Sequence, residues 1–292
     1  MGSITTEHKS SFPKKPVPSG AWDTHHHIFE PDRFPFAEGR HFTPARASLE
    51  DLQKFEKSIG VDHVYLDTVS NELLDEYHAA GVRSVRLDFF RHKAMDNVQI
   101  QAELMEATAQ RLAKWGKPGW SIQIQQPHLE FWPRLRDVVD RSPVPVVVDH
   151  CALIAGSSYR VNDYVTNIQD GSYLAEGERI DLAALCETLR NGNLWMKISA
   201  PYRCSNLAPG YDDLRWLVRR FVDANPRRVV WGSDWPHTQR HKDRVGKSSS
   251  SEEAFLQIDD KAWIESLSKW MSEDEWQLLW VENPATLYDY HE

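Results

Sequence analysis

Short apolar segments alternate with helical segments along almost the whole chain. Continuous β-branched runs such as "VPVVV" and "RVVWG" are typical of strands that are covered on both faces. Strict alternation of strand and helix predicts a parallel sheet with helices packed on it. We expect strands over residues 20–29, 61–67, 82–90, 119–125, 144–150, 193–199 and 227–234.

The segments between these strands carry the start and stop signals of helices. Ser48 predicts an N-cap, acidic residues follow in the first turn, and Gly60 predicts the C-terminal end. Pro133 is compatible with a helix only near its first turn. We expect helices over residues 48–60, 71–81, 95–116, 128–142, 181–192 and 211–226, and further helices from about Lys261 onward.

The alternation does not by itself separate a closed (β/α) barrel from an open doubly wound sheet. No G-x-G-x-x-G follows the first strand, which disfavours a dinucleotide-binding sheet. A closed barrel normally has about eight strands, and the pattern supplies one fewer. Two loops, 151–180 and 238–259, are long enough to be lids. The serine run 248–251 predicts disorder in the second, whereas Tyr159, Tyr164 and Tyr173 favour the first as the lid.

Composition and charge narrow the class of protein. The chain has 292 residues and a formal net charge of −9. This charge argues against a nucleic-acid-binding protein, which needs a basic surface patch. No apolar run approaches the ~18 residues of a membrane span. Residues 1–19 are polar and predict a disordered leader before one domain over residues 20–292. The scattered cysteines Cys151, Cys186 and Cys204 predict no disulfide framework and a cytoplasmic location.

Ionisable side chains stand at the C-terminal ends of most predicted strands, the edge where a parallel barrel carries its chemistry. His25 and His27 are two residues apart and therefore share a face, while His26 points the other way and is interpreted as structural. Two imidazoles on one face could bind one divalent metal, and His150 and Asp234 stand at the ends of other strands. The alternative is a hydrogen-bonded pair of core histidines.

Asp234, Arg86 and Arg203 can each be interpreted as either functional or structural residues. Asp234 lies between Trp231 and Trp235, and an apolar wall would raise its pKa and suit it to act as a base. The alternative is an aspartate that caps a helix or braces a loop. Arg86 and Arg203 could hold substrate carboxylates, because the guanidinium matches them bidentately. Their alternative is a salt bridge to Asp88 or Asp67.

Six motifs resemble, in sequence and in order, the amidohydrolase superfamily: "DTHHHIF", "PFAEGRHFTPA", "AGVRSVRLDF", "VVVDH", "MKISAPYR" and "WGSDWPH". The closer resemblance is to the branch that contains 2-pyrone-4,6-dicarboxylate lactonase and related lactone hydrolases, and it runs from about Gly20 to Pro284. It implies a distorted TIM barrel that hydrolyses small carboxylated lactones. A sister branch on the same fold consists of metal-dependent decarboxylases.

The resemblance implies a role for each matching residue. Asp234 would activate water, and His25, His27 and His150 would polarise the carbonyl. If a metal is bound, its ligands would be His25, His27 and Asp234. The substrate-binding candidates are Arg86, Arg203, Arg91 and His237. The branch works without metal, so we expect no required cofactor, with one divalent metal such as zinc as the alternative and a small organic acid or lactone as the substrate.

The sequence also departs from the family pattern. Residues 59–82 have room for one strand where the family has two, so we expect a barrel short of one βα unit. Such a loss leaves an inactive degenerate barrel as a further possibility. Phe42 and Gln125 stand where the pyrone-dicarboxylate enzyme has tyrosines, which leaves the exact substrate open.

Overall fold

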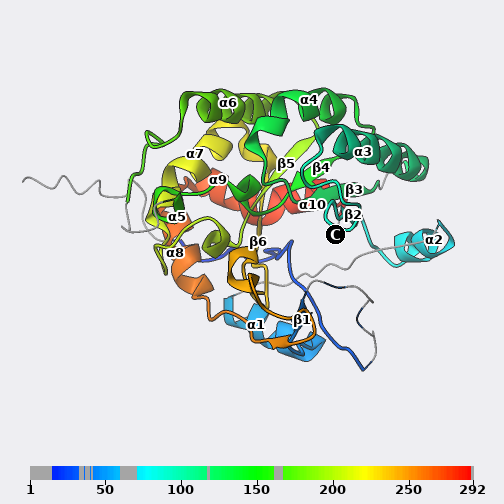
Figure 1. Ribbon diagram of the computed structural model, residues 1–292, viewed down its shortest axis with the longest axis horizontal. Helices are drawn as coiled ribbons and strands as arrows, with labels where there is room; N and C mark the ends of the chain where they lie inside the picture. The colour runs from blue at the N-terminus through cyan, green and yellow to red at the C-terminus, as the bar shows by residue number, and fades with distance from the viewer. Residues whose placement is uncertain are drawn as a thin grey trace, which may run out of the picture.

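A five-stranded parallel sheet forms the centre of the protein. The computed structural model describes residues 15–32, 36, 40, 42–59, 71–116, 119–160 and 167–290. The sheet order is β2 (Ser84–Leu87), β3 (Ser121–Ile124), β4 (Val146–Val148), β5 (Leu194–Ser199) and β6 (Val229–Gly232). Every neighbouring pair is parallel (Figure 1). The predicted parallel α/β class is therefore confirmed.

Crossover helices connect the strands of this sheet. The helices between consecutive strands are α3 (Val98–Leu112), α4 (Trp132–Arg141), α6 (Glu176–Asn191) and α7 (Arg215–Ala224). They pack side by side along one face of the sheet (Figure 1). All three β4 valines are at most 1% exposed, so this strand buries both of its faces. Pro133 lies in the first turn of α4, where its missing amide costs no helix hydrogen bond.

The remaining elements flank this core. They are β1 (Thr43–Pro44), α1 (Leu49–Ile59), α2 (Asn71–Ala79), α5 (Ser157–Arg160), β7 (Glu252–Glu253), α8 (Asp260–Trp270), α9 (Glu273–Gln277) and α10 (Asn283–Leu287). The expected N-cap of α1 is confirmed, because the Asp51 amide donates to Ser48 Oγ and Asp51 Oδ2 accepts from the Ser48 amide. Among the described residues, no helix combines the length and apolarity needed to cross a bilayer.

The expected first strand, residues 20–29, is not a regular strand. It runs parallel to β6, with the Thr24 amide donating to the Trp231 carbonyl at 3.1 Å, but it forms only isolated bridges. The cause is Asp23, whose Oδ1 accepts from the amides of His25 and Ser233 at 3.0 and 2.9 Å. These two amides are therefore not available for the backbone hydrogen bonds of a regular strand pair.

Closure of the barrel is not seen in the part of the chain that the structure describes. The sheet has β2 and β6 as its edges, and the 20–29 segment covers the β6 edge only through its isolated contacts. The strand expected over 61–67, with Asp67, falls outside the described residues. The described residues therefore form a parallel α/β sheet that does not close into a barrel, and the predicted loss of one βα unit stays a prediction.

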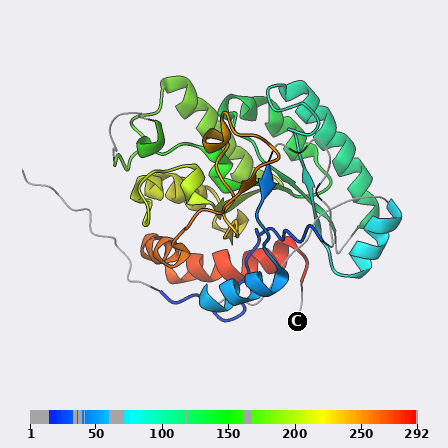
Figure 2. The same ribbon diagram turned by 60° about the horizontal axis from the view of Figure 1, so that its bottom comes forward.

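Two segments that were expected to be irregular make specific contacts with the rest of the domain. Within the expected leader 1–19, buried Lys15 donates to the carbonyls of Ser268 and Met271 at 2.9 and 2.8 Å at the end of α8. The serine-rich loop 238–259 is also placed, because β7 within it pairs with β1 (Figure 2). In addition, Thr43 Oγ1 donates to the Ser249 carbonyl at 2.7 Å.

Candidate active site

Asp234 is the centre of a buried polar cluster at the C-terminal edge of the sheet. It follows β6, is 1% exposed and has a left-handed backbone with φ of 65°. His150 follows β4 with φ of 55°, and Ala200 follows β5 with φ of 45°. Non-glycine residues in this region cost about 1–3 kcal/mol each and cluster at functional sites. The chain therefore bends sharply where each of these strands delivers its side chains.

Three histidines meet Asp234. His25 Nε2 and His27 Nε2 lie 3.2 and 3.3 Å from Asp234 Oδ1 and 3.2 Å from each other. His150 Nε2 lies 3.8 Å from the same oxygen, and His150 Nδ1 contacts Ser199 Oγ at 2.9 Å. None of the three contacts to Oδ1 has hydrogen-bond geometry. The side chains predicted from separate strands are thus brought together, with an acceptor lone pair of Asp234 available between them.

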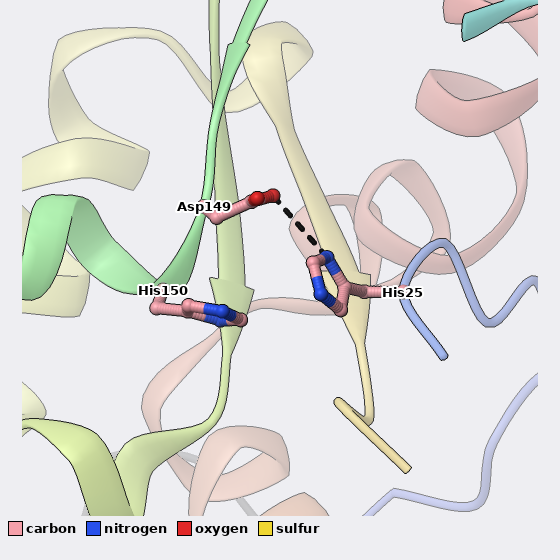
Figure 3. A group of neighbouring side chains, drawn as sticks. All are labelled: His25, Asp149 and His150. Carbon is pink, nitrogen blue, oxygen red and sulfur yellow. Dashed lines mark ion pairs between the residues drawn. The ribbon is translucent and has the colours of Figure 1, made fainter. Parts of the chain in front are cut away.

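A second buried carboxylate, that of Asp149, contacts the histidine cluster through His25. Asp149 Oδ1 lies 3.2 Å from His25 Nδ1, and Figure 3 shows His25 facing Asp149 and His150, which come from the end of β4. Lys197 Nζ, fully buried, lies 3.3 Å from Asp149 Oδ1 and 3.1 Å from His25 Nδ1. Arg86 Nη1 donates to Asp149 Oδ2 at 2.5 Å. Two cations therefore compensate this carboxylate.

The environment of Asp234 differs from the apolar wall predicted from its tryptophan neighbours. Burial alone would raise its pKa, but Arg203 and the histidines outweigh that effect and hold the pKa of Asp234 well below its usual range. Arg203 Nε donates to Asp234 Oδ2 at 2.8 Å, and the Tyr202 hydroxyl donates to the same oxygen at 2.5 Å. Asp234 is consequently ionised at neutral pH, and the expected raised pKa was wrong.

The three imidazoles differ in the direction in which their pKa values are shifted. Burial works to lower the pKa of His25, yet the adjacent Asp149 raises it overall. Burial lowers the pKa of His27, and it lowers that of His150 to well below the usual value. His25 is therefore the imidazole that holds a proton most readily, and His27 and His150 are neutral near pH 7.

The donor sets allow a test of metal binding. His25, His27 and Asp234 present two nitrogens and one oxygen within 4.8 Å of one another, and Asp234 Oδ1 accepts no hydrogen bond, so this set fits one divalent ion. His25, Asp149 and His150 form a second set of the same size. There the Lys197 ammonium already contacts Asp149 and His25, as a cation would. The second set therefore does not fit a metal.

A cavity of about 570 Å³ opens onto the cluster. His27, Arg86, His150, Arg203 and Asp234 line it, so five of the predicted site residues share one pocket. His25 lies beneath them, 5% exposed. From loop 238–259 the pocket receives Thr238 and Arg244, whereas loop 151–180, expected to be the lid, contributes only Leu153 among its described residues.

Two predicted substrate-binding residues lie elsewhere. Arg91 is exposed and does not line the pocket. His237 is buried, with Nε2 at 3.0 Å from Asp260 Oδ2 at the start of α8, and it faces a separate hollow beside Trp235. Cys151 is 1% exposed and burial raises the pKa of its thiol to about 12, so this thiol is not suited to act as a nucleophile.

Three residues that hold the cluster were given no role in the site from the sequence. Tyr202 and Ser199 contact Asp234 and His150, and Lys197 contacts Asp149. A signal was present for each, because all lie in the "MKISAPYR" motif at the end of one strand. The sequence gives no means of telling which of these polar side chains turns inward.

His26, interpreted as structural, faces away from the pocket toward α1. Its ring, Asp23 and Glu56 of α1 place donor atoms within 4.8 Å of one another. Burial, with Asp23 nearby, raises the pKa of Glu56 to about 8. This group joins the 20–29 segment to α1 on the side of the segment opposite to the pocket.

Comparisons with known proteins agree with this architecture. The amidohydrolase family profile (Amidohydro_2) matches residues 55–289. The chain is 30% identical to a 2-pyrone-4,6-dicarboxylate hydrolase of Comamonas testosteroni, over 94% of this chain and 93% of the relative. It is 25% identical to a 4-sulfomuconolactone hydrolase of Hydrogenophaga intermedia, over 76% of each chain.

A solved structure shows the same fold. It is that of a proposed 2-pyrone-4,6-dicarboxylic acid hydrolase from Pseudomonas putida, which superimposes with a TM-score of 0.63 at 20% identity, over 94% of this chain and all of the other. The long profile match and the relative aligned along nearly the whole chain show the family. The chain belongs to the amidohydrolase family, in the branch represented by the 2-pyrone-4,6-dicarboxylate hydrolases.

Proposed function

We propose that this protein hydrolyses small carboxylated lactones and that Asp234 is the general base. The observation that supports it most is the acceptor lone pair of Asp234 Oδ1, which lies among three imidazoles at the floor of a cavity lined by arginines. The names of the relatives, a pyrone-dicarboxylate hydrolase and a sulfomuconolactone hydrolase, agree in substrate class.

The proposed reaction uses the protonation states described above. Ionised Asp234 accepts a proton from water as the water oxygen bonds to the lactone carbonyl carbon. The low pKa of Asp234 makes it a weak base towards free water, but the water becomes acidic as the new C–O bond forms, so the transfer is completed late. The carbonyl oxygen becomes an oxyanion that His27, His150 and Arg203 can stabilise. Asp234 then returns the proton to the ring oxygen as the ester C–O bond breaks.

The charge balance supports a version in which no metal is required. Asp149 is matched by Lys197 and Arg86, and Asp234 by Arg203. If an ion is held by His25, His27 and Asp234, it would polarise the carbonyl when bound. A metal-dependent decarboxylase would use the same ligands.

We further infer that the barrel lacks one βα unit before β2. The alignment with the Comamonas testosteroni hydrolase runs over 320 positions, more than the 292 residues of this chain, so the chain carries deletions relative to that enzyme. The buried charges around Asp234 are nevertheless compensated, which supports an active site over a degenerate one.

The first experiment is an activity screen on lactones that carry one or two carboxylates. We expect turnover by the wild type, and we expect Asp234→Asn to lower kcat by about 10²–10⁴-fold because the general base is removed. Circular dichroism checks that the variant is folded. A fully active D234N variant excludes Asp234 as the base. A cooperatively melting wild type without turnover on any lactone would favour the degenerate barrel.

Metal removal separates the hydrolase from the decarboxylase. We expect purified active protein to contain less than about 0.1 equivalent of zinc, manganese or iron, and we expect a chelator to leave kcat unchanged. Elemental analysis and turnover are measured on the same sample. Stoichiometric metal, with activity lost on chelation and restored by zinc, would overturn the metal-free version.

A further inference from the structure

Arg244 differs from the other arginines of the pocket in the use of its donors. Arg86 donates to Asp149 and to Gln125 Oε1, the latter at 3.1 Å. Arg203 donates to Asp234 and to Thr238 Oγ1, the latter at 2.9 Å. Arg244 Nη2 is buried and meets no hydrogen-bond acceptor among the described residues. A buried donor without an acceptor is costly, so this one requires an explanation.

The guanidinium of Arg244 is fixed in place from two sides. Its Nε donates to Glu253 Oε2 at 2.8 Å, and its carbon Cζ lies 3.7 Å from the centre of the Phe42 ring. Phe42 directly precedes β1 and Glu253 lies in β7, and these two strands pair in parallel. The side chain of Arg244 is only 15% exposed. Held in this way, Arg244 is one of the residues that line the cavity.

Phe42 and Arg244 also connect two expectations from the sequence. The family resemblance implies a tyrosine at the position of Phe42, and Phe42 has no hydroxyl to offer a substrate. It offers a ring face on which a guanidinium stacks. The loop that carries Arg244 was expected to be disordered and instead lies at the pocket.

We propose that Arg244 binds a carboxylate of the substrate through its guanidinium and thereby selects lactones with two carboxylates. The other carboxylate would be held nearer Asp234, by Arg86 or Arg203. This inference rests on the proposed function for the nature of the substrate, but the anion site can be measured without turnover. A charge-assisted hydrogen bond to a carboxylate is among the stronger polar contacts, so its loss should be easy to detect.

Binding of inert diacids tests the site directly. Isophthalate carries two carboxylates in the same 1,3 relation as those of 2-pyrone-4,6-dicarboxylate, and benzoate carries one. By calorimetry, we expect Arg244→Gln to weaken isophthalate binding about 10- to 100-fold and to leave benzoate binding within about twofold. Arg244→Lys, which retains the charge but not the fork, should be intermediate.

Arg240→Gln is the matched control. Arg240 lies on the same loop and pairs with Asp243 and Asn206, and it does not line the pocket. We expect this variant to bind isophthalate as the wild type does. Equal isophthalate affinity of wild type and R244Q would overturn the proposal, as would an equal loss in R240Q. If R244Q does not fold, failure of R244K to differ from wild type would also overturn it.

Turnover distinguishes this inference from the proposed function. With 2-pyrone-4,6-dicarboxylate as substrate, we expect R244Q to raise KM about 10- to 100-fold and to change kcat less than about threefold, because Arg244 lies away from the reacting ester. No turnover by wild type, together with weakened isophthalate binding by R244Q, would reject the lactonase and retain the anion site. Turnover by both proteins with an unchanged KM in R244Q would retain the lactonase and reject the anion site.

Discussion

At the scale of single residues, the site is a balance of buried charges. Lys197 is fully buried and contacts Asp149, His25, Gln123 and the Thr24 carbonyl. A buried ammonium is tolerated only when it is paired and hydrogen-bonded. The same contacts place His25 against Asp149, so Lys197 positions the imidazole that lies beneath the pocket.

We predict that Lys197→Met destabilises the protein by about 3 kcal/mol, because Asp149 loses one of its two cations. The free energy of unfolding is measured by urea denaturation. Asp149→Asn serves in a double-mutant cycle with it. The double variant should lose less free energy of unfolding than the sum of the two single variants, because the Lys197 and Asp149 charges are then removed together. Additive losses would contradict a direct coupling between Lys197 and Asp149.

At the scale of elements, the site depends on how closely the 20–29 segment approaches the end of β6. Gly232, the last residue of β6, makes this approach possible, since a Cβ there would lie 2.5 Å from His25 Cβ and 2.9 Å from the His25 amide nitrogen. A real side chain does not fit at those distances. One glycine therefore sets the spacing between His25 and Asp234.

We predict that Gly232→Ala lowers stability by about 1–3 kcal/mol and displaces His25 from Asp234. Activity should fall more than stability explains, because a shift of this size misaligns the base and the imidazoles. The matched control is Gly177→Ala in α6, where a Cβ would meet nothing within 4 Å. That change should be neutral or slightly stabilising. Wild-type kcat in G232A would contradict the prediction.

At the scale of the whole molecule, α1 closes one side of the domain and carries a buried carboxyl group. Glu56 is 5% exposed, and its pKa is raised to about 8, first by burial and then by Asp23. A folded-state pKa above that of the unfolded chain favours the protonated form in the fold. The stabilisation from Glu56 is therefore present below about pH 4.5 and is lost as the pH rises to about 8.

We predict that Glu56→Gln flattens the pH dependence of global stability over this range. Relative to wild type, the variant should gain stability from pH 5 to pH 8, with a melting temperature roughly 2–4 °C higher at pH 8 per 1 kcal/mol gained. Glu50→Gln, which removes an exposed carboxylate of the same helix, is the control. Parallel stability curves for wild type and E56Q would show that Glu56 does not titrate in this range.

The sequence by itself determined the parallel α/β class, the order of its elements and the residues that meet at the strand ends. Periodicity reports which faces are buried, and in a parallel sheet all strand ends lie at one edge. His25, His27, His150, Arg86, Arg203 and Asp234 could therefore be predicted to converge.

Tertiary structure alone decided the charge state of the site and the identity of its walls. Asp234 has a lowered pKa because Arg203 and the histidines approach it in space, although its sequence neighbours are tryptophans. Arg244 reaches the pocket because β7 pairs with β1, more than 200 residues away in the chain. Electrostatic interactions and long-range pairing depend on distances that no local pattern encodes, which is why these features had to come from the structure.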